Sequence, residues 1–131
     1  MKIGFVGLGN VGGKLAGSLL RNGHDVTVRD LDAGLCAQFA GLGAKVADCP
    51  ADLARDCDLV ITCLPSPASC SAVMEGADGL LAGLTPDTIW AEMSTTDEAE
   101  VKRLGEKVSA LGAFPVDCPV SGGCHRAATG N

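Results

Sequence analysis

The sequence predicts an α/β fold with a doubly wound, mostly parallel sheet and helices on both of its faces. Short apolar runs alternate with segments of helical periodicity along the whole chain. The run at residues 58–64 is almost continuously apolar, which is typical of a parallel strand buried on both faces. Because crossovers between parallel strands are right-handed, this alternation places helices on both sides of one sheet.

Turn and cap residues divide the chain into the expected elements. Gly23 ends the first helix, since glycine adopts the left-handed conformation that often follows a last helical turn. Asp30 or Asp32 caps one later helix, and Thr96 or Asp97 caps another. The expected strands are residues 2–6, 25–29, 44–46, 58–64, 88–93 and 114–117. The expected helices are residues 10–22, 31–40, 48–55, 69–74 and 97–111. Residues 76–83 are expected to form a loop with one turn, and residues 118–131 a loop.

The first strand runs straight into the turn Gly7-Leu8-Gly9-Asn10-Val11-Gly12, which predicts a binding site for a pyrophosphate. Gly7 allows the tight turn, Gly9 lets the backbone lie against the phosphates, and Gly12 lets the next helix pack close to the strand. The helix that begins near Asn10 directs free N–H groups and the positive end of its dipole at the anion. A glycine-rich turn without a ligand is the alternative.

Asp30 ends the second strand, 18 residues after Gly12. This position is typical of the acid that hydrogen-bonds the ribose hydroxyls, so the turn and the acid together predict a dinucleotide site. In this fold class ligands bind beyond the carboxyl ends of the strands. The candidate loops are therefore residues 7–12, 30–32, 64–69, 94–96 and 118–127.

Composition limits the class of protein. The chain has 131 residues, which suits one domain, and only 3% of them are aromatic, so the core must be mostly Leu, Val, Ala and Ile. A net charge of −6 argues against a nucleic-acid partner. The sequence shows no apolar run long enough for a transmembrane helix and no signal peptide before the first strand, so we expect no membrane partner.

The cysteines predict neither a metal site nor disulfides. Seven cysteines without a Cys-x-x-Cys pair, together with only two histidines, argue against a zinc site, and we expect no metal. We interpret the cysteines as small buried residues in a reducing compartment rather than as a disulfide framework. The expected location is therefore cytoplasmic.

Five segments resemble the β-hydroxyacid dehydrogenases and follow one another in the order found in that family. They are residues 4–12, 23–28, 64–65, 93–95 and 117–123. The last segment, Asp117-Cys118-Pro119-Val120-Ser121-Gly122-Gly123, is the most diagnostic. Its form is closer to members that act on small acids, such as 3-hydroxyisobutyrate dehydrogenase and tartronate semialdehyde reductase, than to 6-phosphogluconate dehydrogenase. The resemblance covers essentially the whole chain and implies a Rossmann-type NAD(P)-binding domain over residues 1–131.

The resemblance implies a role for each residue that matches a family motif. The residues implied to line the pyrophosphate are Gly7, Gly9, Asn10, Val11 and Gly12. Leu64 and Pro65 are implied to border the cofactor, and Ser94 or Thr95 to lie near its nicotinamide end. The residues implied to hold the substrate carboxylate are Ser121, Gly122 and Gly123. A small hydroxyl and unshielded N–H groups suit that role, and an ordinary flexible turn is the alternative.

The expected cofactor is NAD, with NADP as the alternative. Family members that prefer NADP carry an Arg just after the second strand, where this chain has Leu31. The Asp30 carboxylate would accept hydrogen bonds from ribose hydroxyls and repel a 2′-phosphate. Arg29 favours NADP if its side chain turns toward that phosphate, although strand alternation directs it elsewhere.

The resemblance implies hydride transfer between nicotinamide and the β-carbon of a small 3-hydroxy acid. The family's general acid/base Lys lies in a Lys-x-x-x-Asn pattern on a helical second domain for catalysis and dimerisation, and this chain has no match for it. The chain also has Glu92 where the family more usually has Asp. We therefore expect an N-terminal portion that is inactive alone, and apolar surface left bare by the second domain would favour a homo-oligomer. The alternatives are a non-catalytic NAD(P)-binding module and a fragment of a 6-phosphogluconate dehydrogenase-type enzyme.

Overall fold

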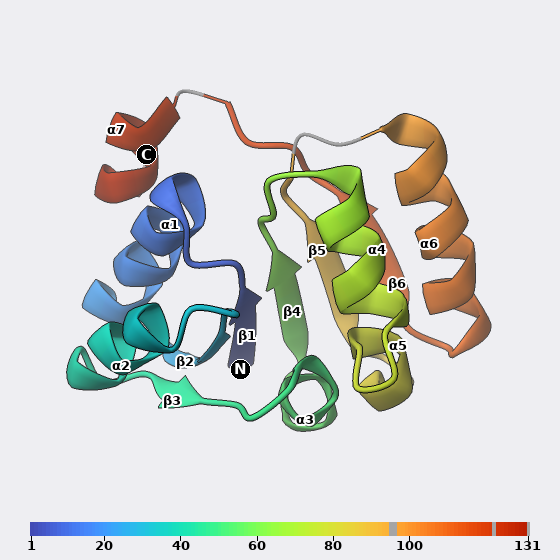
Figure 1. Ribbon diagram of the computed structural model, residues 1–131, viewed down its shortest axis with the longest axis horizontal. Coiled ribbons are helices and arrows are strands. Elements are labelled where there is room, and N and C mark those ends of the chain that lie inside the picture. Colours follow the sequence, from blue (N-terminus) through green and yellow to red (C-terminus); the bar gives the residue numbers. More distant parts are fainter. Residues whose placement is uncertain (95–96, 122, 131) are drawn as a thin grey trace.

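The computed structural model describes residues 1–94, 97–121 and 123–130 of the protein. One parallel sheet has the strand order β3-β2-β1-β4-β5-β6, and helices cover both of its faces (Figure 1). The strands are β1 (Lys2–Val6), β2 (Asp25–Arg29), β3 (Lys45–Val46), β4 (Leu59–Thr62), β5 (Ile89–Glu92) and β6 (Phe114–Asp117). The helices are α1 (Asn10–Arg21), α2 (Ala33–Gly41), α3 (Pro50–Asp56), α4 (Pro67–Glu75), α5 (Leu80–Gly83), α6 (Glu98–Ala110) and α7 (Gly123–Thr129). The predicted fold class is confirmed.

Each face of the sheet has its own hydrophobic core. Val60 and Trp90 pack on the face covered by α3, α4, α5 and α6. Their chain neighbours Ile61 and Ala91 pack on the opposite face, under α1 and α2. Strands β4 and β5 are thus buried on two sides, which explains the almost uninterrupted apolar run that the sequence shows at β4.

Side-chain caps fix where three helices begin after strands of the sheet. Asp32 caps α2, and its carboxylate accepts a hydrogen bond from the Gly34 N–H at 2.8 Å. Ser66 caps α4 by accepting from the Ser69 N–H at 3.1 Å, and Pro67 occupies the first turn. Asp97 caps α6. Of the alternative caps in the sequence, the structure uses Asp32 and Asp97.

Helix α7 lies in a segment for which the sequence predicted a loop, and that prediction was wrong, whereas the four-residue α5 falls where the sequence predicted a loop with one turn. Leu80 of α5 is fully buried in one core, so this segment packs as a helix despite the glycines around it. Helix α7 packs along α1, where Ala127 is 3% exposed and the Arg21 guanidinium donates a hydrogen bond to the Ala128 carbonyl. Tertiary packing therefore outweighed the local glycine signals that predicted loops.

An ion network joins α4 to α6. Arg103 and Lys107 of α6 both pair with Glu75 of α4, and Arg103 also pairs with Glu100. The Arg103 guanidinium beside Glu75, with Lys107 and Ser71 adding to it, holds the pKa of that carboxyl well below its usual range. The pairs are partly solvent-exposed, so each contributes little to the stability of the fold.

Strand β6 forms one edge of the sheet, and all four of its residues are exposed. Phe114 is 56% exposed and Val116 is 45% exposed. The Phe114 N–H donates to the Thr88 carbonyl at 2.8 Å, and just beyond the strand the Cys118 N–H donates to the Glu92 carbonyl at 2.9 Å.

The seven cysteines are all free thiols, and three of them, Cys36, Cys57 and Cys70, are buried. The other four are only half-buried, so the interpretation of the cysteines as small core residues holds for three of the seven. Across the described ranges, each helix falls short of the length and apolarity that a membrane span requires.

Candidate functional site

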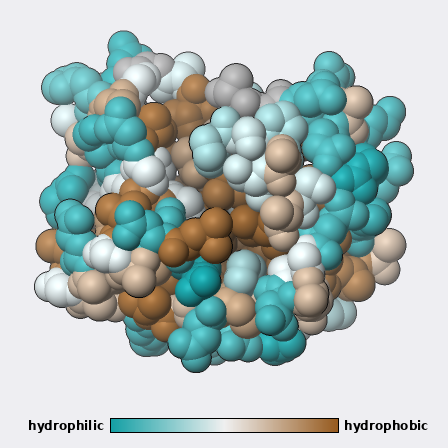
Figure 2. Space-filling view, in the orientation of Figure 1, coloured by the Kyte–Doolittle hydropathy of each residue, from teal (hydrophilic) through white to brown (hydrophobic). Residues whose placement is uncertain are grey.

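A groove of about 1200 Å³ opens at the carboxyl ends of the strands. It lies where the strand order reverses, since β1 is flanked by β2 on one side and β4 on the other. Figure 2 shows apolar residues gathered in the middle of this face, with hydrophilic residues around them. Open α/β sheets bind ligands at this kind of switch point. The groove exceeds the roughly 300–1,000 Å³ of ordinary small-molecule pockets, as a long ligand requires.

The predicted glycine turn forms the floor of the groove and has no room for side chains on its protein side. Gly7 has a φ of +101°, and a Cβ there would lie 2.1 Å from the Cys63 carbonyl oxygen. A Cβ on Gly12 would lie 2.0 Å from the Gly7 carbonyl oxygen. At Gly9, by contrast, a Cβ would meet no protein atom within 4 Å. Gly9 therefore leaves open space in the groove itself, where a ligand can approach the backbone.

Helix α1 begins at the groove. Gly9 is its N-cap and offers no side chain to the first-turn N–H groups. Asn10 and Val11 line the groove beside it. Because α1 has 12 residues, its N-terminus combines unpaired amides with the positive end of a helix dipole, which suits a phosphate.

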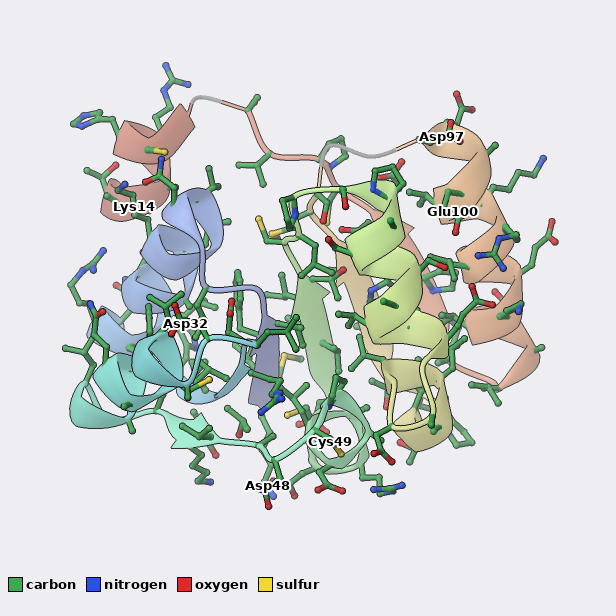
Figure 3. The ribbon with its side chains drawn as sticks, viewed as in Figure 1. Lys14, Asp32, Asp48, Cys49, Asp97 and Glu100 are labelled. Carbon is green, nitrogen blue, oxygen red and sulfur yellow. The ribbon has the colours of Figure 1, made fainter. Side chains whose placement is uncertain are left out.

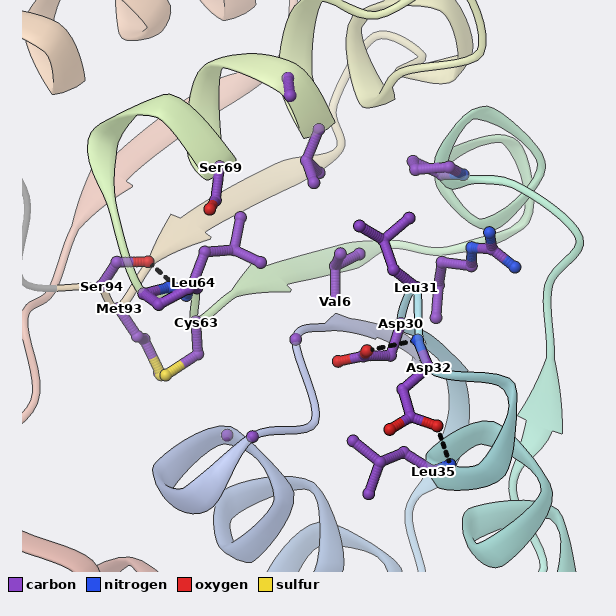
Figure 4. Close-up of a pocket in the computed structure, with 18 of the residues that line it drawn as sticks. Val6, Asp30, Leu31, Asp32, Leu35, Cys63, Leu64, Ser69, Met93 and Ser94 are labelled. Carbon is purple, nitrogen blue, oxygen red and sulfur yellow. Dashed lines mark hydrogen bonds between the residues drawn. The ribbon is translucent and has the colours of Figure 1, made fainter.

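Asp30 ties the glycine turn to the end of β2. One carboxylate oxygen accepts from the Leu8 N–H at 2.8 Å. The other accepts from the Asp32 N–H at 2.8 Å, the bond drawn in Figure 4. The predicted ribose-binding acid is thus also a structural anchor of the turn. Beside it, Leu31 lines the groove and is 94% exposed.

The other half of the groove is lined by Leu64, Pro65 and Ser94, for which the sequence predicted a place beside the cofactor. Figure 4 shows Leu64 and Ser94 on one side of Val6, with Asp30 on the other side. The Ser94 hydroxyl oxygen accepts a hydrogen bond from the Leu64 N–H at 2.7 Å. Thr95, the other residue predicted there, lies outside the described residues.

The predicted substrate loop is divided between two hollows. Gly123 lines the groove, whereas Ser121 lines a smaller hollow of about 430 Å³ between α1 and α7. Met93 and Val120 line both hollows, so the two adjoin. Gly122 lies outside the described residues, and the role of this loop stays a prediction.

Sequence reasoning missed two parts of the groove wall. Asp48, Cys49 and Pro50 line it after β3 (Figure 3 labels the first two). Their position after a parallel strand was a signal, because every such loop reaches the same edge of the sheet. Ala72 and Val73 of α4 also line the groove, and no sequence motif marks them.

Among the described residues, the groove has neither a cluster of metal ligands nor a lysine or histidine for proton transfer. Within the described ranges, no group of three or more His, Cys, Asp or Glu side chains is arranged to hold a metal ion. No lysine and no histidine lines the groove in that same part of the chain. Burial raises the pKa of the Cys63 thiol in the groove wall, so this thiol is a poor nucleophile.

A family model and a curated relative each match nearly the whole chain. A family model for the NAD binding domain of 6-phosphogluconate dehydrogenase matches residues 2–131. The mitochondrial 3-hydroxyisobutyrate dehydrogenase of Rattus norvegicus is 37% identical over 129 residues, which are 98% of this chain and 38% of that protein.

Two solved structures extend these matches. A 3-hydroxyisobutyrate dehydrogenase from Salmonella typhimurium superposes with a TM-score of 0.91 and 30% identity, covering 100% of this chain and 46% of that one. The protein Psf3 in complex with NADP+ and 2-OPP superposes with a TM-score of 0.92 and 27% identity, covering 98% and 45%. The chain thus spans less than half the length of each of these proteins.

Gly12→Ala should destabilise the fold. The new methyl group would lie 2.0 Å from the Gly7 carbonyl oxygen, so α1 must move away from β1. We expect a loss of about 1–3 kcal/mol in the free energy of unfolding, measured by urea titration. The matched control is Gly41→Ala in α2, where a Cβ meets no atom within 4 Å and stability should hold or rise slightly. Equal stability of the two variants would contradict the close approach of α1.

Proposed function

The chain belongs to the family described as the NAD binding domain of 6-phosphogluconate dehydrogenase, and we propose that it is the dinucleotide-binding portion of an oxidoreductase acting on a small 3-hydroxy acid. The observation that carries this proposal is the glycine corner. It presents the N-terminus of α1 to the groove with open space at Gly9. An elongated groove on both sides of that corner suits a ligand with a central diphosphate.

In this proposal the chain binds and orients the cofactor. The first-turn amides of α1, near Asn10 and Val11, hold the diphosphate. The Asp30 carboxylate accepts from the hydroxyls of the adenosine ribose, and Leu64 and Pro65 border the nicotinamide half. The bound cofactor supplies the hydride acceptor or donor, while these residues fix where its reactive carbon faces.

The substrate proposal rests on the similarity to 3-hydroxyisobutyrate dehydrogenases. We propose that Ser121, Gly122 and Gly123 hold the substrate carboxylate, because Gly123 already lines the groove. A general acid/base Lys would come from a helical second domain of the intact protein. The seven free thiols are compatible with the reducing cytoplasm that we propose as its location.

We propose NAD rather than NADP as the cofactor. The groove near the expected adenosine ribose is lined by the acids Asp30, Asp32 and Asp48 and by one base, Arg29. The 2′-phosphate of NADP would add a charge of about −1.5 to −2 beside these carboxylates, which would repel it. Leu31, next to Asp30, offers no positive charge that would hold it.

Gly9→Ala should abolish binding of NAD+ without unfolding the protein. The methyl group meets no protein atom, so it would occupy the space that the diphosphate needs. Isothermal titration calorimetry of the 131-residue chain should show heat with NAD+ for the wild type and for Gly41→Ala, and none for Gly9→Ala. A wild type that gives no heat with either nicotinamide dinucleotide would refute the proposed function.

NAD+ should bind about tenfold or more tightly than NADP+ at low ionic strength, because the nearby carboxylates repel the phosphate. The ratio should shrink with added salt and in Asp30→Asn, as charge repulsion is screened or removed. Asp52→Asn is the control, since Asp52 is an exposed acid of α3 outside the groove. Tighter binding of NADP+ by the wild type would overturn the choice of NAD.

The 131-residue chain should bind the dinucleotide without turning over substrate. No lysine among the described residues lines the groove, so no side chain of the expected kind can move the hydroxyl proton. The measurement is NADH absorbance with NAD+ and 3-hydroxyisobutyrate, and the expected rate is that of buffer alone. Appreciable oxidation by this chain would contradict the assignment of the general base to another domain.

A further inference from the structure

A buried carboxyl group lies behind the groove at the end of β5. Glu92 is fully buried, and both of its oxygens accept hydrogen bonds. Oε2 accepts from the Cys70 thiol at 2.7 Å, and Oε1 accepts from the Ser94 N–H at 2.7 Å. Burial of a carboxyl group is unfavourable unless its oxygens find donors, so these two contacts account for its presence in the core.

The contacts of Glu92 continue to the wall of the groove. Ser94 is 4% exposed, and its hydroxyl oxygen accepts from the Leu64 N–H at 2.7 Å (Figure 4). Both Ser94 and Leu64 line the groove, whereas Glu92 and Cys70 do not. One series of hydrogen bonds therefore joins α4, β5 and the segment after β4, and it ends at the half of the groove away from Asp30.

We propose that Glu92 is a positioning residue for the nicotinamide half of the groove, acting through Ser94 on the backbone at Leu64. The inference rests on the proposed dinucleotide function. It assigns no contact between Glu92 and the ligand. The carboxyl group fixes the Ser94 backbone, and the Ser94 hydroxyl fixes the Leu64 amide that borders the ligand.

The Cys70 thiol, which donates to Glu92 on the side away from the groove, stays protonated. Burial raises the pKa of the Cys70 thiol, and the neighbouring Glu92 carboxyl adds to this effect. The thiol thus stays protonated, and its S–H can donate a hydrogen bond to Oε2 of Glu92. Since Cys70 belongs to α4, this contact also ties the helix that carries Ser69 and Val73 to the end of β5.

The test compares two ligands on one protein. ADP contains only the adenosine half and the diphosphate, whereas NAD+ also fills the half beside Leu64 and Ser94. Calorimetry should show that Glu92→Gln and Ser94→Ala each weaken NAD+ binding by about three- to tenfold, since each variant removes one hydrogen bond of the series. ADP binding should change less than about twofold, because the glycine corner is untouched. The double variant should bind NAD+ no more weakly than Ser94→Ala alone, as residues in one series are not additive.

Two further variants separate positioning from general stability. Cys70→Ala removes the thiol donor and should weaken NAD+ binding selectively, while Cys70→Ser restores a donor and should recover it. Thr88→Val is the matched control: the buried Thr88 hydroxyl pairs with the Thr85 hydroxyl at 3.0 Å just before β5, at the opposite end of that strand from Glu92. It should lower stability and leave the ratio of NAD+ to ADP affinity unchanged.

The possible results are distinct. Selective, non-additive weakening of NAD+ binding with rescue by Cys70→Ser supports the inference. Unchanged NAD+ binding in Glu92→Gln, or equal weakening of NAD+ and ADP, overturns it and leaves the proposed function standing. A wild type that binds neither ligand overturns the proposed function, and this inference with it.

Discussion

The close approach of α1 to the end of β1 is the constraint on which the rest of the site depends. Gly7 and Gly12 meet with no space for a methyl group between them, so the first amides of α1 lie directly at the head of the strand. The Asp30 carboxylate then fixes this corner to β2 through the Leu8 N–H. A longer distance between helix and strand would withdraw the amides from the groove and separate its two halves.

The two halves of the groove are held by different means. Near β2, carboxylates accept from exposed backbone amides, as Asp30 and Asp32 do. Beyond β4, the contacts run through the core, from Glu92 to Ser94 and on to Leu64. Both arrangements use side chains to hold backbone, so that the walls are preorganised before a ligand enters. Exposed carboxylates therefore hold the end of the groove near β2, whereas buried side chains hold the end beyond β4.

The sequence was most informative where a short-range signal and the fold agree. The glycine turn, Asp30, Leu64, Pro65 and Ser94 all line one groove because parallel strands bring their carboxyl ends to one edge. The helix at α7 was missed because its packing partner, α1, is distant in sequence. The contact of Glu92 with Cys70 was missed for a similar reason, since no local pattern marks a bond that spans 22 residues. Ser121 was grouped with Gly123 by motif, and only the three-dimensional path of the chain separates their surroundings.

The exposed edge at β6 has a property that follows from the direction of its amides. The Phe114 N–H faces inward to the neighbouring strand, so in a parallel ladder the amide position of Pro115, the next residue, faces outward. Proline carries no N–H, and its presence there removes a donor from the free side without weakening the sheet. Edge strands with intact donors recruit strands from other molecules. At β6 the free edge is interrupted near its middle, which makes it a poor template for intermolecular sheet growth.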